Sequence, residues 1–354
     1  MTPGETGVLA EPGGRLITRF GASNLAFAAV LALAAGVPTV VATAVPAAAS
    51  TAAYAETIMG SLGGGFTDAT AINAGGQVTG YSNTDKEIQV PCPPQKYGQP
   101  KKCFEAVQHA FLFSTGTMTD LGTLGGIGSE GLAINDSGEV VGFSQTKAGT
   151  SDAFLWNGTR MTDLGPLSQF YPDGINDSGQ IAGACGNDSV PCLDSNGTFT
   201  ALPNPPNLDC TGAIAINNNG QVLGACGDSS GNSHGVVWTN GTPTVLPTLG
   251  GPYFAPTAIN NNGDVVGFGQ TSTFAQHGFL YRNGTMTDLG NNIFLYAIND
   301  SDVMVGNDLI VSNGTVQDIN NLIPAGSPGI NYAVGINDNG QIIAKTNGIL
   351  LTPN

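Results

Sequence analysis

Histidines and aspartates are the residues of this chain best suited to acid–base or metal chemistry. The sequence contains three histidines, which are His109, His234 and His277. An imidazole can bind a metal ion or transfer a proton near neutral pH. Four aspartates share a second register: Asp120, Asp163, Asp288 and Asp318. Two carboxylates that face each other about 5–10 Å apart could hydrolyse a glycoside.

The placement of these residues favours a structural role. Each histidine opens the same short apolar segment in a different copy of a repeat, and Asp152 takes that place in another copy. Equivalent residues of successive repeats are spread along the array, so they do not converge on one site. We expect the four aspartates to face solvent at an outer edge. Asp173 and Asp209 lie between repeats and are the first acids to test for catalysis.

Other catalytic and metal-binding patterns are missing from the sequence. It has no Gly-x-Ser-x-Gly elbow, phosphate loop or His-Glu-x-x-His motif. Turns such as Asn135–Gly138 suggest calcium, but a calcium loop needs more oxygen ligands than these short segments carry. Asx-type turns explain them better. We therefore predict no catalytic residue, no metal and no cofactor.

The six cysteines form three local pairs. Cys92 and Cys103 flank one segment, Cys185 and Cys192 flank a second, and Cys210 and Cys226 flank a third. Each pair could meet across a hairpin at a separation that suits a disulfide. A metal site is the alternative, but no Cys-x-x-Cys spacing and no nearby histidine support it. We predict three disulfides.

A repeated phrase determines the elements that position all these residues. The phrase consists of Ile-Asn, then a glycine-containing turn, then a β-branched run that ends in glycine. It recurs at intervals of roughly 40 residues, after one longer first interval. The copies start at Ile72, Ile134, Ile175, Ile216, Ile259, Ile298 and Ile336. In the second copy, strands are predicted over 131–135, 139–144, 152–156 and 161–165. Four strands per repeat are typical of a propeller blade.

The two ends of the repeat region favour a closed ring over a β-solenoid. The last copy stops after its third strand, and residues 54–63 supply a fourth strand that has no blade of its own. We predict an all-β, seven-bladed β-propeller of four-stranded antiparallel blades, with the N-terminal strand completing the last blade. The Ile-Asn strand is then innermost, and the short turns share one face. The variable loops and the connections between blades lie on the opposite face.

Three segments of the first two blades carry a family resemblance. They are His109–Phe113, Met118–Gly126 and Ile134–Gly142, and their pattern recurs over nearly everything after residue 54. Together they resemble the HAF repeat of extracellular bacterial proteins. Cys192–Ser195 departs from it, because His-Ala-Phe-Leu is expected there. The resemblance implies export and a repeat structure, and it brings no catalytic residues.

The first 49 residues have the features of a signal peptide. Arg15 and Arg19 precede a long uncharged segment that ends in Ala47–Ala49. Cleavage there is favoured by the small residues, while an uncleaved anchor is the alternative. Residues 50–354 are predicted to form a single propeller domain with an insertion at about 83–107.

Charge and composition limit the choice of partners. The net charge is −16, only 10% of residues are charged, and the chain has 52 glycines. Nucleic acid and anionic membranes both need a cationic face, so we expect neither as a partner. The composition suits a turn-rich β protein. We expect a secreted monomer.

Aromatic residues gather where the copies differ, on the variable-loop face. They are Phe66, Tyr97, Phe170, Tyr171, Tyr253, Phe254, Phe294, Tyr296 and Tyr332. Such rings could stack on sugars or hold a protein loop, although packing between blades is the alternative. The main hypothesis is an exported, non-catalytic protein that binds a protein or glycan through this face. The alternative is a carbohydrate-active hydrolase or lyase with carboxylates at the channel mouth.

Overall fold

A computed structural model describes residues 52–90, 103–345 and 347–354 of the chain, and these described residues belong to one compact unit. The segment predicted as a signal peptide lies outside the described residues. Within the described part, no helix is long and apolar enough to cross a membrane.

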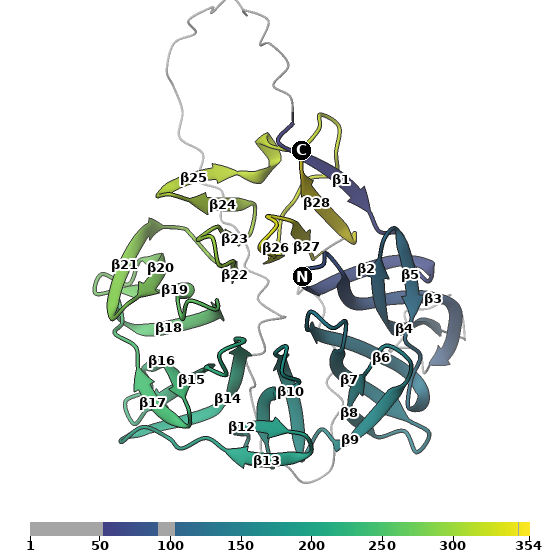
Figure 1. Ribbon diagram of the computed structural model, residues 1–354, viewed down its shortest axis with the longest axis horizontal. Coiled ribbons are helices and arrows are strands. Elements are labelled where there is room, and N and C mark those ends of the chain that lie inside the picture. Colours follow the sequence, from purple (N-terminus) through teal and green to yellow (C-terminus); the bar gives the residue numbers. More distant parts are fainter. Residues whose placement is uncertain (1–51, 91–102, 346) are drawn as a thin grey trace, which may run out of the picture. The chain divides into compact units, whose positions relative to one another are not determined.

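The unit is a seven-bladed β-propeller in which every blade is a four-stranded antiparallel sheet (Figure 1). Blade one comprises β2 (Gly63–Ile72), β3 (Val78–Val90), β4 (Cys103–Ser114) and β5 (Thr117–Asp120). Blade two comprises β6 (Gly125–Ile134), β7 (Val140–Thr146), β8 (Ser151–Trp156) and β9 (Met161–Pro166). Blade three comprises β10 (Phe170–Ile175), β11 (Ile181–Cys185), β12 (Val190–Ser195) and β13 (Thr198–Ala201).

The remaining blades follow the same order. Blade four comprises β14 (Leu208–Ile216), β15 (Val222–Asp228), β16 (Ser233–Thr239) and β17 (Thr242–Val245). Blade five comprises β18 (Gly250–Ile259), β19 (Val265–Thr271), β20 (Gln276–Arg282) and β21 (Thr285–Asn291). Blade six comprises β22 (Ala297–Ile298), β23 (Met304–Gly306), β24 (Leu309–Ser312) and β25 (Thr315–Asp318), followed by the 3₁₀-helix η1 (Ile319–Asn321). Blade seven comprises β26 (Ala333–Ile336), β27 (Ile342–Ala344), β28 (Ile349–Pro353) and the N-terminal β1 (Tyr54–Ile58).

Blade seven closes the ring as the sequence predicts. β1 pairs antiparallel with β28, from Tyr54 opposite Pro353 to Ile58 opposite Ile349. The sheet order is β1-β28-β27-β26, so β1 is outermost and the strand of the repeated phrase is innermost. One sheet therefore contains both ends of the described chain, and no blade is left with three strands.

The core lies between neighbouring blades. In one cluster, Ala110 and Leu121 of blade one pack against Val140 and Phe154 of blade two, and all four are buried. Glycines in the second strands allow the inner strands to approach closely. A Cβ on Gly142 would lie 1.9 Å from the carbonyl oxygen of Glu130. The Val-Val-Gly part of the repeat thus has a packing cause.

A ring of seven asparagines joins all the blades at their inner strands. Each side-chain amide donates a hydrogen bond to the backbone carbonyl of the next asparagine, over 2.8–3.2 Å. The members are Asn73, Asn135, Asn176, Asn217, Asn260, Asn299 and Asn337. The last of them donates back to the first over 3.0 Å. All seven are at most 5% exposed.

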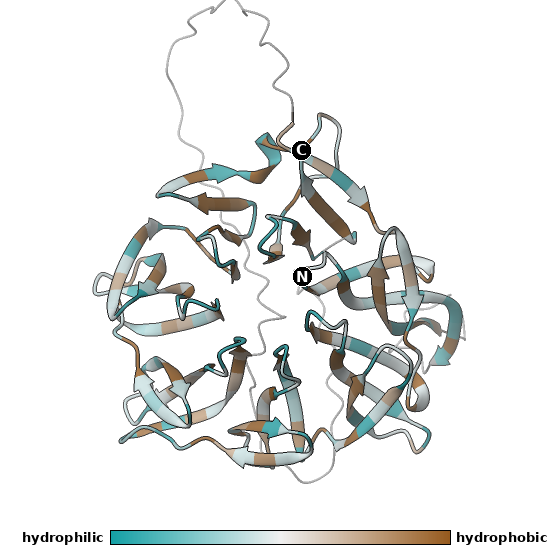
Figure 2. Cartoon of the chain, in the orientation of Figure 1, coloured by the Kyte–Doolittle hydropathy of each residue, from teal (hydrophilic) through white to brown (hydrophobic). Residues whose placement is uncertain are grey.

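The same asparagines form the turns that follow. Each Oδ1 accepts the backbone N–H four residues later; in Asn176, for example, it accepts from Gln180 over 3.0 Å. This confirms Asx-type turns at these positions. Figure 2 shows the hydrophilic turns close to the centre of the ring and the apolar strands behind them.

Removing one ring amide should destabilise the whole propeller. Asn176→Ala removes one of the two hydrogen bonds that the buried Asn217 carbonyl accepts, the other being from Gly220 N–H, and it leaves the Gln180 N–H without its partner. A lost bond costs about 0.5–1.5 kcal/mol and a buried group left unpaired about 1–3 kcal/mol, so we expect the free energy of unfolding in urea to fall by about 1–4 kcal/mol. Ser178→Ala, in the same turn, should change it by less than about 0.5 kcal/mol. Equal effects of the two variants would contradict a structural role of the ring.

Candidate functional site

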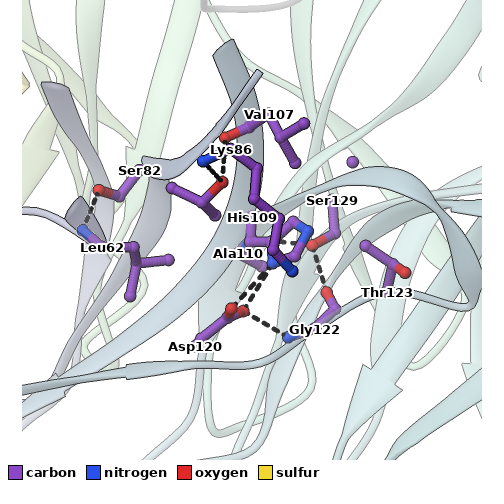
Figure 3. A network of polar contacts seen from close by, with 12 residues as sticks. Leu62, Ser82, Lys86, Val107, His109, Ala110, Asp120, Gly122, Thr123 and Ser129 are labelled. Atoms are coloured by element: carbon purple, nitrogen blue, oxygen red, sulfur yellow. Dashed lines mark hydrogen bonds and ion pairs between the residues drawn. The ribbon is translucent and has the colours of Figure 1, made fainter. Parts of the chain in front are cut away.

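The histidines pair with aspartates of their own blades, which sequence reasoning did not predict. His109 Nδ1 lies 2.9 Å from both carboxylate oxygens of Asp120 on the adjacent strand β5 (Figure 3). His277 and Asp288 repeat the arrangement at 2.8 and 2.9 Å. His234 differs, since its Nε2 lies 3.3 Å from Asp228 at the end of the second strand. The histidines thus belong to separate blades and share no site.

The outer-strand aspartates have a common structural role. Asp120, Asp163 and Asp288 each accept the backbone N–H of the glycine two residues later, over 2.7–2.8 Å. Asp318 accepts from Asn320 N–H over 2.8 Å and caps η1. Strands β5 and β25 end at these aspartates, whereas β9 and β21 continue past them. Asp120, Asp163 and Asp288 are exposed, as expected, and Asp318 is half-buried.

A cluster of ionisable side chains forms where blades one, two and seven meet. We call Asp68, Tyr81, Glu130 and Lys345 the inner polar cluster. The Tyr81 hydroxyl donates to Asp68 Oδ2 over 2.8 Å. Asp68 is 4% exposed, and its other oxygen, Oδ1, has no hydrogen-bond partner among the described residues.

Backbone and hydroxyl contacts hold the inner polar cluster together. Ala69 N–H donates to the Lys345 carbonyl over 3.2 Å, which places that lysine beside Asp68. Ser129, the residue before Glu130, accepts from Ala110 N–H over 2.9 Å and donates to the Gly122 carbonyl over 2.6 Å. Figure 3 shows these contacts between blades one and two. They fix strand β6, and hence Glu130, against blade one.

The surroundings of Glu130 make it an acid that titrates near neutral pH. Burial raises the pKa of Glu130, and repulsion from Asp68 adds to this; attraction to Lys345 opposes both, and the pKa is about 7. Burial also raises the pKa of Asp68, while the Tyr81 hydrogen bond and Lys345 work against that rise. The pKa of Tyr81 is raised by burial, by its bond to Asp68 and by both carboxylates. Asp68 and Glu130 therefore lie in different environments. Two neighbouring carboxyl groups in different environments are typical of acid–base sites.

A pocket of about 220 Å³ adjoins Glu130. It lies between the long β3–β4 hairpin of blade one and strands β6 and β7 of blade two. Its lining includes Tyr81, Ile88, Val107, Glu130 and Phe143. The pocket thus combines apolar and aromatic walls with one half-buried carboxyl group.

A cluster of aromatic rings forms between blades five and six. Phe268 lies 6.2 Å from Tyr253, 5.1 Å from Phe294 and 6.3 Å from Tyr296, measured between ring centroids. Phe268 is buried, and the other three are half-buried. We call these four residues the aromatic cluster. Sequence reasoning predicted three of its members and missed Phe268.

The other predicted ligand-binding residues fall into different places. Phe66 and Tyr332 are 38% and 40% exposed, and Phe66 contacts Tyr81 at 6.0 Å. Tyr171 is half-buried and lies 6.2 Å from Phe143. Tyr97 lies outside the described residues.

Phe170 and Phe254 are core residues, which corrects their assignment to a binding surface. Each is 1% exposed. Phe254 stacks on Phe279 at 4.3 Å, and Phe170 meets Phe199 edge-on at 4.8 Å. Neighbouring residues of a strand point to opposite faces, so Tyr253 is accessible while Phe254 is not.

Two of the three predicted disulfides are confirmed. Cys185 pairs with Cys192 across the β11–β12 hairpin, and Cys210 pairs with Cys226 directly opposite it on β15. Cys92 lies outside the described residues, so its pairing with Cys103 stays a prediction. Among the described residues, no group of three or more His, Cys, Asp or Glu could hold a metal ion.

The acids singled out from the sequence are not the ones that the fold brings together. Asp209 is exposed at the start of β14 and accepts from Asn204 Nδ2 over 3.2 Å. Asp173 is half-buried inside the innermost strand β10, where a position between blades was expected. Asp68 and Glu130 both stand five residues before a ring asparagine. That shared register is the signal that could have identified them.

Comparisons with known proteins support no family assignment. No family model matches this chain, and no curated protein matches it. Solved structures that resemble it include TolB from Acinetobacter baumannii, at 12% identity and a TM-score of 0.43, over 70% of this chain and 60% of TolB. Another is a Pyrococcus horikoshii acylaminoacyl peptidase, at 13% identity and a TM-score of 0.42, over 61% of this chain and 36% of the peptidase.

A gluconolactonase from Xanthomonas campestris is also similar, at 8% identity and a TM-score of 0.40, over 61% of this chain and 82% of that one. This chain spans less than two thirds of the length of TolB and about a third of the length of the peptidase. These likenesses say nothing about what this propeller binds. Its class is that of a seven-bladed β-propeller, and its function has to be argued from its own residues.

Alanine variants of Tyr253 and Phe254 can distinguish a ring that packs in the core from a ring at the surface. Phe254→Ala removes a fully buried ring and should lower the free energy of unfolding by about 3–5 kcal/mol. Tyr253→Ala removes a half-buried ring and should cost less than about half as much. Urea denaturation of the two variants measures the difference. Equal losses would show that Tyr253 is also a core residue.

The His109–Asp120 pair should make the stability of the protein fall as the pH becomes acidic. Burial raises the pKa of Asp120, but the bonds from His109 and Gly122 N–H outweigh it, and the pKa lies below its usual 3.8. The stabilisation is therefore complete above about pH 4–5 and is lost as the pH falls through the lowered pKa. Asp120→Asn should lower the melting temperature clearly at pH 7 and much less at pH 3.

Asp163→Asn is the matched control, because Asp163 keeps the bond from glycine but has no histidine opposite. Its effect at pH 7 should be the smaller of the two. If the difference in melting temperature between wild type and Asp120→Asn stays constant from pH 7 to pH 3, the pair does not stabilise the protein in the proposed way.

Proposed function

We propose that this protein is an exported, ligand-binding propeller that binds a glycan on its variable-loop face. One observation carries the proposal: half-exposed aromatic rings and a cluster of carboxylates are both presented by the inner strands and the loops that precede them. Aromatic faces stack on sugar rings, and carboxylates accept hydrogen bonds from sugar hydroxyls.

The differences between equivalent positions of the seven blades support ligand binding on the variable-loop face. The asparagine turns on the opposite side are tied into a continuous hydrogen-bonded ring, which leaves little freedom for change. The position five residues before each ring asparagine is free to vary: it is acidic in Asp68 and Glu130 and aromatic in Tyr171, Phe294 and Tyr332. Residues that vary on a rigid scaffold are the usual carriers of binding.

A carbohydrate-active hydrolase or lyase is the second candidate, and Glu130 is the observation that favours it. A carboxyl group with a pKa near 7 suits a general acid, and Asp68 is a second acid nearby. On this hypothesis Glu130 donates the proton to the leaving oxygen. Asp68 and Glu130 replace Asp173 and Asp209 as the acids to change.

Export is supported by two disulfides, which persist in oxidising compartments. Membership of the HAF repeat proteins stays a proposal. The His–Asp pairs give a physical reason for the histidine and the aspartate of that pattern.

A glycan array probed with the purified protein tests the proposal. We expect binding to at least one glycan class, and the double variant Tyr253→Ala, Phe294→Ala should weaken it about tenfold or more, since each stacked ring contributes on the order of 1 kcal/mol. Phe199→Ala, on an outermost strand, is the control and should bind like wild type. Absence of binding to any glycan would refute the proposal, and retained binding in the double variant would exclude the aromatic cluster as the binding site. Turnover of a bound polysaccharide, abolished by Glu130→Gln, would favour the hydrolase instead.

A further inference from the structure

The inner polar cluster carries one more negative charge than it can neutralise internally. Asp68 and Glu130 contribute two carboxylates, and Lys345 contributes one ammonium group. Asp68 Oδ1 is buried without a hydrogen-bond partner among the described residues, so its charge is only partly compensated. An uncompensated charge in a partly dry site favours any cation that can approach it.

The proton is one such cation. At its pKa of about 7, Glu130 takes up a proton as readily as it keeps its charge, because burial and Asp68 both oppose ionisation. A cationic group on a ligand would serve the same purpose and would compete with that proton. The net charge of −16 also draws cations toward the protein and repels anionic sugars.

The pocket beside Glu130 indicates the size and shape of the ligand that carries the cationic group. Its volume of about 220 Å³ lies below the roughly 300–1,000 Å³ of sites that enclose a drug-sized ligand, so it suits a single ring. Phe143 stands opposite Glu130 in the β6–β7 register, and Tyr81 lines the same pocket. Aromatic rings beside a carboxylate can stack on a sugar and also attract an ammonium group.

We propose that this pocket binds an amino sugar whose amino group is free and protonated, with the Glu130 carboxylate pairing with the ammonium group and Phe143 and Tyr81 flanking the sugar ring. The proposal rests on glycan binding as the function and specifies the glycan class. Asp68 acts as a positioning residue, which holds the Tyr81 hydroxyl and keeps the local potential negative.

The charged groups around Glu130 determine the expected pH dependence. They are Asp68 on β2, Tyr81 on β3, Glu105 on β4 and Lys345 after β27. Below about pH 7 Glu130 is increasingly protonated, so the affinity for an ammonium group should rise as the pH increases toward that value. Between about pH 5 and 6.5 the ionised fraction of Glu130 grows on the order of tenfold or more.

Calorimetry with two sugars tests the proposal. The probes are the trimer of glucosamine and the trimer of N-acetylglucosamine, which differ only in the charge and acetylation of the amine. We expect the glucosamine trimer to bind at least tenfold more tightly at pH 6.5, and to lose about tenfold in affinity at pH 5. The acetylated trimer should show little pH dependence.

Two matched variants assign the effect to the pocket. Glu130→Gln preserves shape and should reduce glucosamine binding to the level of the acetylated trimer, with no pH dependence between 5 and 6.5. Asp209→Asn removes an exposed carboxylate from blade four, which does not line the pocket, and should bind like wild type. Thermal melts of both variants check that they fold.

The outcomes separate this proposal from the proposed function. If the acetylated trimer binds as well as the free amine, or if Glu130→Gln retains the preference, the amino-sugar proposal is wrong while glycan binding stands. If neither trimer nor any glycan of the array binds, both are wrong.

Discussion

The hydrogen-bonded ring of seven asparagines is the constraint on which the rest of this propeller depends. Each asparagine uses its amide to join the next blade and its Oδ1 to form its own turn, so one residue type sets both the local hairpin and the spacing between sheets. No aspartate could replace it, because a carboxylate has no N–H to donate. Burial of the ring makes every bond costly to lose. The repeat of the phrase in the sequence follows from this dual requirement.

The ring also divides the molecule into a constrained face and a free one. Glycine is required where the second strand passes under an inner-strand carbonyl, as at Gly142 beneath Glu130. That close approach holds the backbone of Glu130 in place and leaves its side chain as the variable part. The scaffold can therefore carry an acid in blades one and two and an aromatic ring in blade six without a change of fold. Function can differ between copies because the backbone geometry does not.

Local patterns predicted much of this structure, and long-range contacts explain what they missed. Strand order, closure by residues 54–58 and two disulfides follow from pairings within a hairpin or from the comparison of chain ends. The association of Asp68 with Lys345 joins the first and last blades, and no sequence spacing indicates it. Phe254 was misplaced because a run of aromatic residues does not show which of two neighbours faces the core. The His109–Asp120 pair was missed although both members were noted, since they were considered as separate registers.

The inner polar cluster is difficult to explain as a stabilising feature alone. A buried carboxylate with an oxygen that lacks a hydrogen bond lowers stability, and well-packed apolar residues of similar size are often neutral or better in such places. The equivalent positions of other blades show that the fold accepts them, because Ala255 takes the place of Asp68 in blade five. Tyr81 and Lys345 compensate only part of the charge. A group of residues that reduces stability, varies between blades and borders a pocket is what a binding site on a rigid scaffold requires. The strained electrostatics of Asp68 and Glu130 therefore point to a ligand that supplies the missing positive charge.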